Sequence, residues 1–455
     1  MDVEELRKER TDNMHAVLNN VMPTRVPCNI SMGQNAIAEY GNVDPVKSFW
    51  DFGLLEDTID ELCEKIPTDV NISGGHVLLP SLYQSIGSKA IKMGADGFMQ
   101  HPNTHMMEPD EYDEFIKDPY AFVVETAAPR VNTDLDIKED AGRAQKAMYL
   151  MQMVNGAVNA KRGAVSARMS KKHGYAPARL GGGGGYAPMD ILSDQLRSFS
   201  GMSTDIRRYR SKVKDAVEAV SPWNKFCGKV PDPANYTRDA YGFYPFHMAT
   251  FMRVKDFEEL WFPALKRQWD DFASHGWRCG AFLEDNWMHL LDYVQELPTG
   301  SVFTFEYAEP KEFKERLGKK FVLSSGFPVK YITQCSKEEV IARTKEWIDI
   351  FAPGGQYIFG FDKSILTLSD FNMENMVAVA QTVREYAVYD DPGTPTGEIF
   401  HSEDYNESDL PEFTSRAYRT WDEYLGLNPN TPENAKDMIM NAEYNACRFY
   451  YSLLQ

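Results

Sequence analysis

Between Trp277 and Ile365 the sequence repeats one arrangement three times: a short apolar run that ends abruptly in ionisable side chains. Residues 281–283 are followed by Glu284 and Asp285, residues 302–305 by Glu306, and residues 357–361 by Asp362 and Lys363. Brief apolar runs rich in aromatic and β-branched residues, separated by amphipathic helical segments, are typical of buried parallel strands with helical crossovers. In such folds the loops at the carboxyl ends of the strands carry the chemistry. These ionisable residues are therefore the main functional candidates.

The whole chain has 455 residues, which fits two or three average domains or a (β/α)₈ barrel with an added segment. We predict an α/β fold, a (β/α)₈ (TIM) barrel with an N-terminal helical extension. Residues 1–160 are expected to hold this extension, with helices and the first barrel elements. Residues 161–455 are expected to hold the main part of the barrel and a C-terminal helix. The strands should end near Glu284, Glu306, Ser325 and Asp362 and open toward one face.

Composition excludes several classes of partner. The net charge of −19 argues against a nucleic acid, because phosphate backbones are bound by basic faces. The six cysteines form no CxxC pair, which favours reduced thiols in a cytoplasmic protein. No apolar run approaches the ~20 residues that span a bilayer, and the N-terminus has no apolar signal core. We therefore expect a cytoplasmic protein with neither a membrane nor a nucleic acid as partner.

Five consecutive glycines, residues 181–185, form the most unusual local sequence. Glycine runs can cradle phosphates, but a Walker loop needs a following Lys-Ser/Thr, which is missing here. The run is better interpreted as a mobile loop that leads into a helix, with Pro188 in the first turn of that helix.

The segment from Tyr241 to Phe251 is rich in aromatic residues and contains His247. It could line a pocket for a flat apolar ligand, although aromatic stretches more often belong to the core. His247 favours the pocket, since a polar tip in apolar surroundings needs a partner. The candidates for substrate binding are Tyr241, Tyr244, Phe246, Asn286, Trp287, Glu306, Asp362 and His101.

Several segments in order resemble the uroporphyrinogen decarboxylase superfamily: EDNWMHLLDYVQELPTG, EPKEFKERLGKKFVLSSGFP, CSKEEVIARTKEWIDIFAPGGQYIFGFDKSI and NMENMVAVAQTVREYAVYD. The resemblance covers residues 180–390 and, more loosely, residues 90–120. It implies a (β/α)₈ barrel. The superfamily contains tetrapyrrole decarboxylases and also cobalamin-dependent methyltransferases, which move methyl groups between small molecules and a corrinoid on a separate protein.

Departures from each branch narrow the expected function. The true decarboxylases grip the carboxylates of the porphyrinogen with an arginine-rich segment, whereas the corresponding CNISMGQNAIAEYG has no arginine. Many methyltransferases of the superfamily hold zinc with a His-x-Cys pair and a distant Cys. Here Phe282 and Glu284 stand in place of that pair and Lys363 stands near the last Cys, so Cys279 and Cys335 are not expected to be ligands. If a metal is bound, Glu284 and His247 are its candidate ligands.

The resemblance implies a demethylating methyltransferase that moves a methyl group from an aryl methyl ether or methylamine to a cobalamin on a corrinoid carrier protein. Breaking such a bond requires an acid or a Lewis acid at the leaving atom. Glu284 or Asp285 would protonate that atom or hold a metal, with adjacent carboxylates raising each other's pKa. His247 would share this role and Lys363 would balance the charge.

Two other functions remain open at this point, and so does a structural role for the acids. A lyase that decarboxylates a tetrapyrrole or a smaller acid would need cations such as Arg207 or Arg208 in the pocket. A barrel without activity would bind the corrinoid or its carrier only. Each acid taken alone could equally be a strand-end cap or an ion-pair partner.

Overall fold

The computed structural model describes residues 2–75, 77–177 and 180–454. Its centre is a parallel sheet in the order β3-β4-β5-β6-β7-β8. The strands are β3 (Leu180–Gly184), β4 (Tyr241–Phe246), β5 (Cys279–Leu283), β6 (Val302–Phe305), β7 (Val322–Ser324) and β8 (Tyr357–Ile358). A separate antiparallel pair joins β1 (Lys92–Met93) to β2 (Met99–Gln100). The parallel strands expected around residues 281, 302, 322 and 357 are confirmed.

Two further segments are bonded to the free edge of β8. The Asn29 N–H donates to the Phe359 carbonyl at 2.7 Å, and Cys28 bridges Phe359 in parallel. On the other side of this segment, the Asp69 N–H donates to the Cys28 carbonyl at 2.8 Å. The Ala176 N–H in turn donates to the Asp69 carbonyl at 3.2 Å. Backbone hydrogen bonds therefore lead from β8 through residues 28–32 and 69–72 to the segment that precedes β3.

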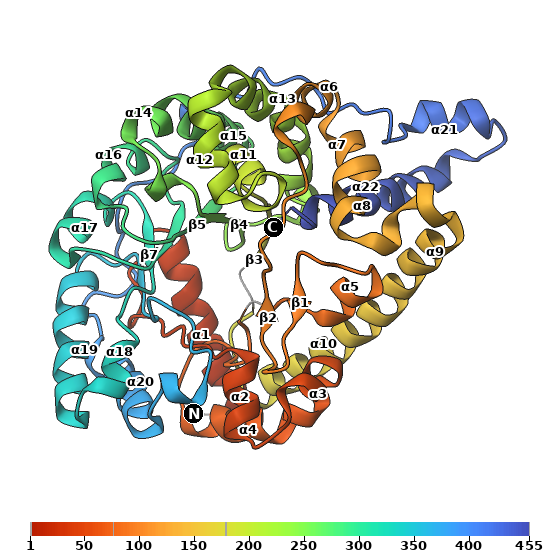
Figure 1. Ribbon diagram of the computed structural model, residues 1–455. Coiled ribbons are helices and arrows are strands. Elements are labelled where there is room, and N and C mark those ends of the chain that lie inside the picture. The colour runs from red at the N-terminus through yellow and green to blue at the C-terminus, as the bar shows by residue number, and fades with distance from the viewer. Residues whose placement is uncertain (1, 76, 178–179, 455) are drawn as a thin grey trace.

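Helices surround the strands on the outside (Figure 1). The first part of the chain forms α1 (Val3–Leu18), α2 (Gln34–Tyr40), α3 (Pro45–Trp50), α4 (Glu56–Lys65), α5 (Pro80–Ser85), α6 (Tyr112–Lys117), α7 (Pro119–Phe122), α8 (Ala128–Val131), α9 (Ile137–Leu150) and α10 (Gly156–His173). Capping boxes fix the start of α1, at Asp2 and Glu5, and of several later helices. No helix in the described part of the chain is long and apolar enough to cross a membrane.

The helices that alternate with the strands follow. They are α11 (Pro188–Ile191), α12 (Ser198–Arg208), α13 (Arg210–Gly228), α14 (Val254–Asp256), α15 (Phe262–Ser274), α16 (Leu291–Val294), α17 (Pro310–Leu317), α18 (Lys330–Gln334), α19 (Lys337–Phe351) and α20 (Met373–Tyr386). The chain ends with α21 (Trp421–Leu427), which stands away from the body, and α22 (Lys436–Ser452), which returns to it (Figure 1).

Alternation along the strands divides the apolar residues between the two faces of the sheet. One apolar cluster runs from Val26 to Leu454 and includes the outward face of β4, where Phe246 packs edge-on against Trp261 at 4.9 Å. Burial of such aromatic rings provides much of the energy that holds helices to a sheet. Because successive side chains of a strand point to opposite faces, the residues between these core positions face inward.

Two sequence predictions were wrong in detail. The glycine run was expected to be a mobile loop, but it forms β3, whose partner is β4. A side chain could not replace Gly184, since its Cβ would lie 2.6 Å from the Phe243 nitrogen and its φ is +121°. The aromatic segment, for which a pocket wall and the core were both considered, was not predicted to be a strand, but residues 241–246 form a regular strand. The helix with Pro188 in its first turn is confirmed.

Candidate active site

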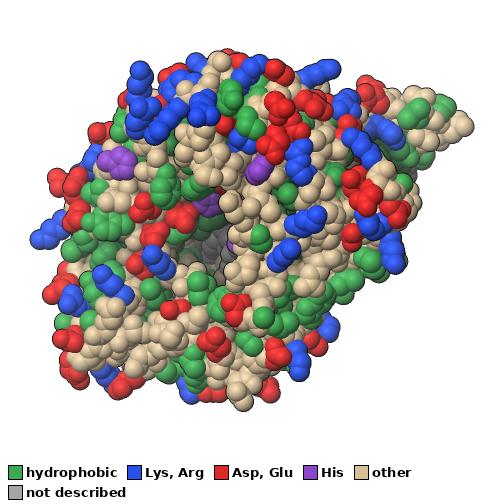
Figure 2. All heavy atoms as spheres, viewed as in Figure 1, with side chains coloured by type: hydrophobic (Ala, Val, Ile, Leu, Met, Phe, Trp, Pro, Cys, Tyr) green, Lys and Arg blue, Asp and Glu red, His purple; other side chains and the backbone are tan. Residues whose placement is uncertain are grey.

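A cavity of about 860 Å³ opens at the carboxyl ends of the strands. Figure 2 shows the face of the molecule hollowed near its centre. All four residues at which strands were predicted to end, Glu284, Glu306, Ser325 and Asp362, line this cavity. The remaining lining residues are Asn29, Ser31, Gly75, Gly183, Gly184, Gly185, Tyr186, Phe243, Pro245, His247, Phe282, Thr304, Phe361, Lys363, Ser364, Arg448, Tyr451 and Ser452. A volume of this size encloses a drug-sized molecule.

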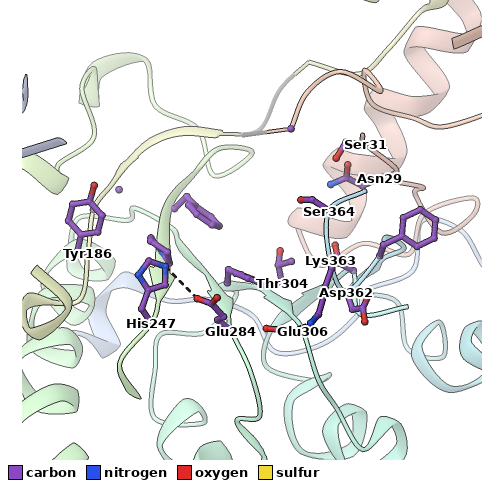
Figure 3. Close-up of a pocket in the computed structure, with 18 of the residues that line it drawn as sticks. Asn29, Ser31, Tyr186, His247, Glu284, Thr304, Glu306, Asp362, Lys363 and Ser364 are labelled. Atoms are coloured by element: carbon purple, nitrogen blue, oxygen red, sulfur yellow. Dashed lines mark ion pairs between the residues drawn. The ribbon is translucent and has the colours of Figure 1, made fainter. Parts of the chain in front are cut away.

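Sheet register brings three ionisable residues to one level of the cavity. Phe246 is paired with Leu283, and Leu283 is paired with Phe305. The next residues along the three strands are His247, Glu284 and Glu306, and their side chains turn inward together. Figure 3 shows them side by side along one wall. Their proximity is therefore a direct consequence of the parallel pairing.

His247 is held from behind by a buried carboxylate that the sequence did not single out. Its Nδ1 lies 2.9 Å from Asp194 Oδ2, and its Nε2 lies 3.5 Å from Glu284 Oε2 in the cavity. Burial acts to lower the pKa of His247, but the hydrogen bond and charge of Asp194, with the charges of Asp190 and Glu284, raise it to about 9. Since that value lies above neutrality, the imidazole carries its proton and both ring nitrogens are donors.

Asp190 anchors the loop that carries His247. Its carboxylate accepts the backbone N–H of His247 at 3.1 Å, that of Met248 at 3.2 Å and the indole N–H of Trp261 at 2.8 Å. Burial raises the pKa of Asp190, and the nearby Asp194 raises it further. Burial also raises the pKa of Asp194, although the hydrogen bond from His247 opposes this shift. Asp194 therefore contacts the imidazole directly, whereas Asp190 acts on it only through its charge.

Glu284 is the half-exposed partner of this array. Burial raises the pKa of its carboxyl, the charge of His247 opposes the rise, and Glu306, Asp194 and Asp285 add to it. The direction agrees with the expectation, but burial is the main cause and the adjacent Asp285 contributes least. Asp285 itself is exposed, has a left-handed φ of +61° and does not line the cavity. Its expected role as an acid beside Glu284 is therefore corrected: its backbone N–H donates to Glu306 Oε2 at 2.8 Å.

Glu306 and Lys363 form an ion pair on the neighbouring wall. Glu306 Oε1 lies 2.5 Å from Lys363 Nζ. Burial acts to raise the pKa of Glu306, but Lys363 and the Asp285 N–H lower it overall, so this carboxylate stays ionised. Burial raises the pKa of Asp362, although it accepts the Val329 N–H at 2.8 Å. Lys363 lines the cavity and has Glu306 as its ion-pair partner.

The aromatic candidates on β4 do not line the cavity. Tyr244 and Phe246 are fully buried on the outward face, where both pack against Trp269. Tyr241 faces inward but lies near the start of the strand, next to Val302 and Val322. The inward positions of this strand that reach the cavity are Phe243, Pro245 and His247. The segment was treated as a loop, so the alternation that separates these two sets was not applied.

Three other candidates for substrate binding lie outside the cavity. Trp287 is buried among the aromatic rings behind β4, and its indole donates to the Glu284 carbonyl at 2.9 Å. Asn286 is exposed, and its side chain accepts the Met288 N–H at 3.0 Å. His101 is exposed in the segment after β2. Trp287 and Asn286 thus shape the loop that presents Glu284 without facing the cavity themselves.

Some cavity residues came from parts of the sequence that offered little local signal. Asn29, Ser31 and Ser364 gather on the wall across from His247 (Figure 3). Arg448, Tyr451 and Ser452 come from α22, at the far end of the chain. Asp190 and Asp194 were the most accessible to prediction, because they are four residues apart in a helix that directly follows the glycine strand.

The described residues do not form a recognisable metal centre. Among residues 2–75, 77–177 and 180–454, no group of three or more His, Cys, Asp or Glu side chains is arranged to hold an ion. Cys279 is buried at the start of β5, and Cys335 follows α18, so neither lines the cavity. A thiolate zinc set of the kind implied by the resemblance does not fit these side chains. The two candidate ligands, His247 and Glu284, both line the cavity, with Nε2 and Oε2 3.5 Å apart.

The cations that line the cavity are not Arg207 and Arg208, the two arginines that a decarboxylase was expected to need there. Arg207 and Arg208 are exposed near the end of α12 and do not line the cavity. The lining cations with fixed charge are Lys363 and Arg448.

In comparisons with known proteins, no family model and no curated protein matches the chain. The chemistry of the cavity therefore carries the functional argument.

Proposed function

We propose that this protein is a corrinoid-dependent methyltransferase that takes a methyl group from a small methylated compound, of the aryl methyl ether or methylamine type. One observation carries the proposal: a protonated His247 and a half-buried Glu284 meet in a cavity at the ends of parallel strands. The resemblance of residues 180–390 to the uroporphyrinogen decarboxylase superfamily supports the same reaction class. The corrinoid would be carried by a partner protein.

We further propose that the strands close into a (β/α)₈ barrel with α1 as part of an N-terminal extension. Six parallel strands are paired in order, and the segments 28–32 and 69–72 extend the bonding from β8 toward β3. Together they would supply the eight strands of such a barrel. Catalytic residues of these barrels come from the carboxyl ends of several strands. His247, Glu284 and Glu306 occupy that position on three of them.

Demethylation breaks the bond between the methyl carbon and an oxygen or nitrogen, and the electron pair stays on that heteroatom. When bound, the corrinoid supplies the nucleophile that accepts the methyl group. The heteroatom leaves more easily if it receives a proton, which this chain can provide at His247 Nε2 or through Glu284. Asp194 keeps the imidazole charged and aimed at the cavity, so the pair holds a proton at neutral pH.

Other residues of the cavity maintain this arrangement. Glu306 accepts the Asp285 N–H and is neutralised by Lys363, which fixes the turn after Glu284. Phe243, Pro245 and Phe282 provide apolar walls that exclude water from the reacting group. Because the described side chains do not fit the thiolate zinc site, the proton takes the place of a Lewis acid in this proposal.

The direct test is incubation with cob(I)alamin and a panel of methoxylated aromatic compounds and methylamines. Methyl transfer would change the absorption spectrum of the corrinoid, and one class of the panel should give this change. Loss of carbon dioxide from a carboxylic acid, without any change in the corrinoid, would favour a lyase instead. A completely unreactive panel, with cob(I)alamin intact, would contradict the proposal.

A further inference from the structure

Arg448 enters the cavity from a helix far away in the sequence. Its helix, α22, is fixed at several points beside the glycine strand: the Trp223 indole donates to Cys447 Sγ at 3.0 Å, and the Tyr186 N–H donates to Tyr451 Oη at 3.0 Å. Tyr451 also bonds to Asn224. Since Tyr451 and Ser452 line the cavity as well, the end of α22 forms one of its walls.

Among the residues that the structure describes, no carboxylate neutralises the guanidinium of Arg448. Its Nη1 donates to the Gly184 carbonyl at 3.4 Å and to the Cys227 carbonyl, both of which are uncharged. The other cations of the cavity have acidic partners: Lys363 is paired with Glu306, and His247 with Asp194 and Glu284. Within the described part of the chain, Arg448 makes no ion pair; besides the two carbonyls, its guanidinium contacts the side chain of Tyr444. Its charge is therefore left without an anionic partner, and the donors that do not face these groups are left for a ligand.

The bare glycine wall gives a ligand access to these donors. Gly183, Gly184 and Gly185 line the cavity beside Arg448 without side chains. A guanidinium with parallel free N–H groups recognises carboxylates in a bidentate manner, and its charge is more effective in a partly dry cavity than in water. A neutral ligand would leave this charge without compensation.

Arg448 and the pair His247–Glu284 lie at different levels along the same wall of strands. The Gly184 carbonyl that it contacts lies in register with Phe243 on β4. His247 follows four residues later, about 13 Å further along a strand that rises ~3.3 Å per residue. Figure 3 shows Tyr186, which follows the glycine strand, on the same side of the cavity as His247. A carboxylate at Arg448 would therefore direct the rest of a small molecule toward His247 and Glu284.

We propose that Arg448 and the glycine strand form a carboxylate subsite, and that the methyl donor is a methylated carboxylic acid. This inference rests on the proposed methyltransferase function and deepens it by naming the substrate class. The carboxylate binds the guanidinium of Arg448, and the methyl group lies at the other end of the molecule, next to His247 and Glu284. Methylated compounds without an anionic group bind weakly, because they leave Arg448 uncompensated.

Binding of benzoate and benzamide separates this inference from the methyl-transfer reaction, since neither compound carries a methyl group. Isothermal titration calorimetry of the intact protein should show benzoate binding at least ~10-fold more tightly than benzamide, as expected for charge-assisted hydrogen bonds. In Arg448→Gln, one amide donor remains for the backbone carbonyls but the charge is lost. Benzoate affinity should fall ~10-fold and benzamide affinity should stay unchanged. The matched control Arg207→Gln removes an exposed arginine outside the cavity and should keep the wild-type preference.

Equal affinity for the two compounds in the wild type, or a preference that survives in Arg448→Gln, would overturn the subsite. Arg448→Lys serves if the glutamine variant does not fold: it keeps the charge without the fork, so benzoate affinity should drop while benzamide affinity does not. Unchanged benzoate affinity in that variant would also overturn the inference. Methyl transfer from neutral ethers as fast as from methoxybenzoates would reject the subsite and leave the methyltransferase standing. A benzoate preference without any methyl transfer would support the subsite and reject the methyltransferase.

Discussion

Two clusters of charged side chains lie at opposite ends of the strands, and they differ in how completely their hydrogen-bonding capacity is used. Where the strands begin, Arg25 donates to Asp69 at 2.6 and 2.8 Å and to Glu9 at 2.8 Å. Asp69 is 1% exposed and also accepts the Cys28 N–H at 2.7 Å. In the cavity at the other end, His247 and Glu284 are 3.5 Å apart and Arg448 has no acidic partner among the described residues.

This difference distinguishes a structural cluster from a functional one better than charge or burial does. The network around Asp69 is nearly saturated: Arg10 Nε lies 3.2 Å from Asp69 Oδ1 but makes no well-aligned hydrogen bond among the described residues. Such a network of buried ions has little left to offer a ligand, and it loses much stability if one member is removed. An unsaturated group in a cavity contributes less to folding and keeps its donors for a substrate. The cluster around Asp69 should therefore determine stability, and the cluster around Glu284 should determine activity.

The largest expected effect is the loss of stability in Asp69→Ala. This change leaves Arg25 and Arg10 buried without their common partner, so the free energy of unfolding should fall by about 3–5 kcal/mol. Chemical denaturation measures the effect. The control Asp113→Ala removes an exposed ion pair with Lys212 and should cost at most about 1 kcal/mol. Similar losses in the two variants would remove the distinction between the two ends.

The strand-end residues of the cavity could be predicted because their signal is local. An apolar run followed by an acid predicts both a strand and the residue at its end, and Glu284, Glu306 and Asp362 were found in this way. Arg448 could not be found in this way, since it reaches the cavity through long-range packing. Asp194 does not line the cavity but contacts His247 from behind, and its only local signal is its spacing of four residues from Asp190. Tyr244 and Phe246 were misplaced because the inward face of β4 depends on recognising it as a strand.

A smaller and more specific effect is expected in Asp194→Asn. Asp194 is the main group that raises the pKa of His247 to about 9, so the variant should move this pKa toward the ordinary value of ~6.5. If protonated His247 supports methyl transfer, the rate should be lost at a lower pH on the alkaline side of the pH–rate profile. The midpoint of this loss should move by as many pH units as the pKa of His247. The pH dependence of methyl transfer is the measurement, and an unmoved alkaline limb would separate His247 from catalysis.

The same pKa makes a prediction for stability in the wild type. His247 binds its proton more tightly in the folded state than in the unfolded state. Its contribution is complete below about pH 6.5 and is lost as the pH rises through about 9. Thermal midpoints measured across this window should decline less in Asp194→Asn than in the wild type. An equal decline in both proteins would mean that other groups titrate there.

The smallest effect is expected in Asp285→Asn. The Asp285 side chain is exposed and lies outside the cavity, and its contact with Glu306 is made by the backbone. The substitution keeps this backbone contact. The free energy of unfolding should therefore change by no more than about 0.5 kcal/mol, and the rate of methyl transfer by no more than roughly twofold. A loss of activity comparable with that of a Glu284 variant would place Asp285 in the chemistry after all.

Methyl transfer to cob(I)alamin by Glu284→Gln tests the central claim most directly. Glutamine keeps the size of Glu284 and can still form hydrogen bonds, but it removes the acidic proton and the negative charge beside His247. Turnover should fall by ~10²-fold or more, typical of a lost general acid, with the thermal midpoint little changed. The matched control is Glu312→Gln, which changes an acid on α17 whose side chain is 55% exposed. This variant should behave as wild type. A Glu284→Gln protein that methylates the corrinoid at the wild-type rate would make Glu284 a structural residue and contradict the account.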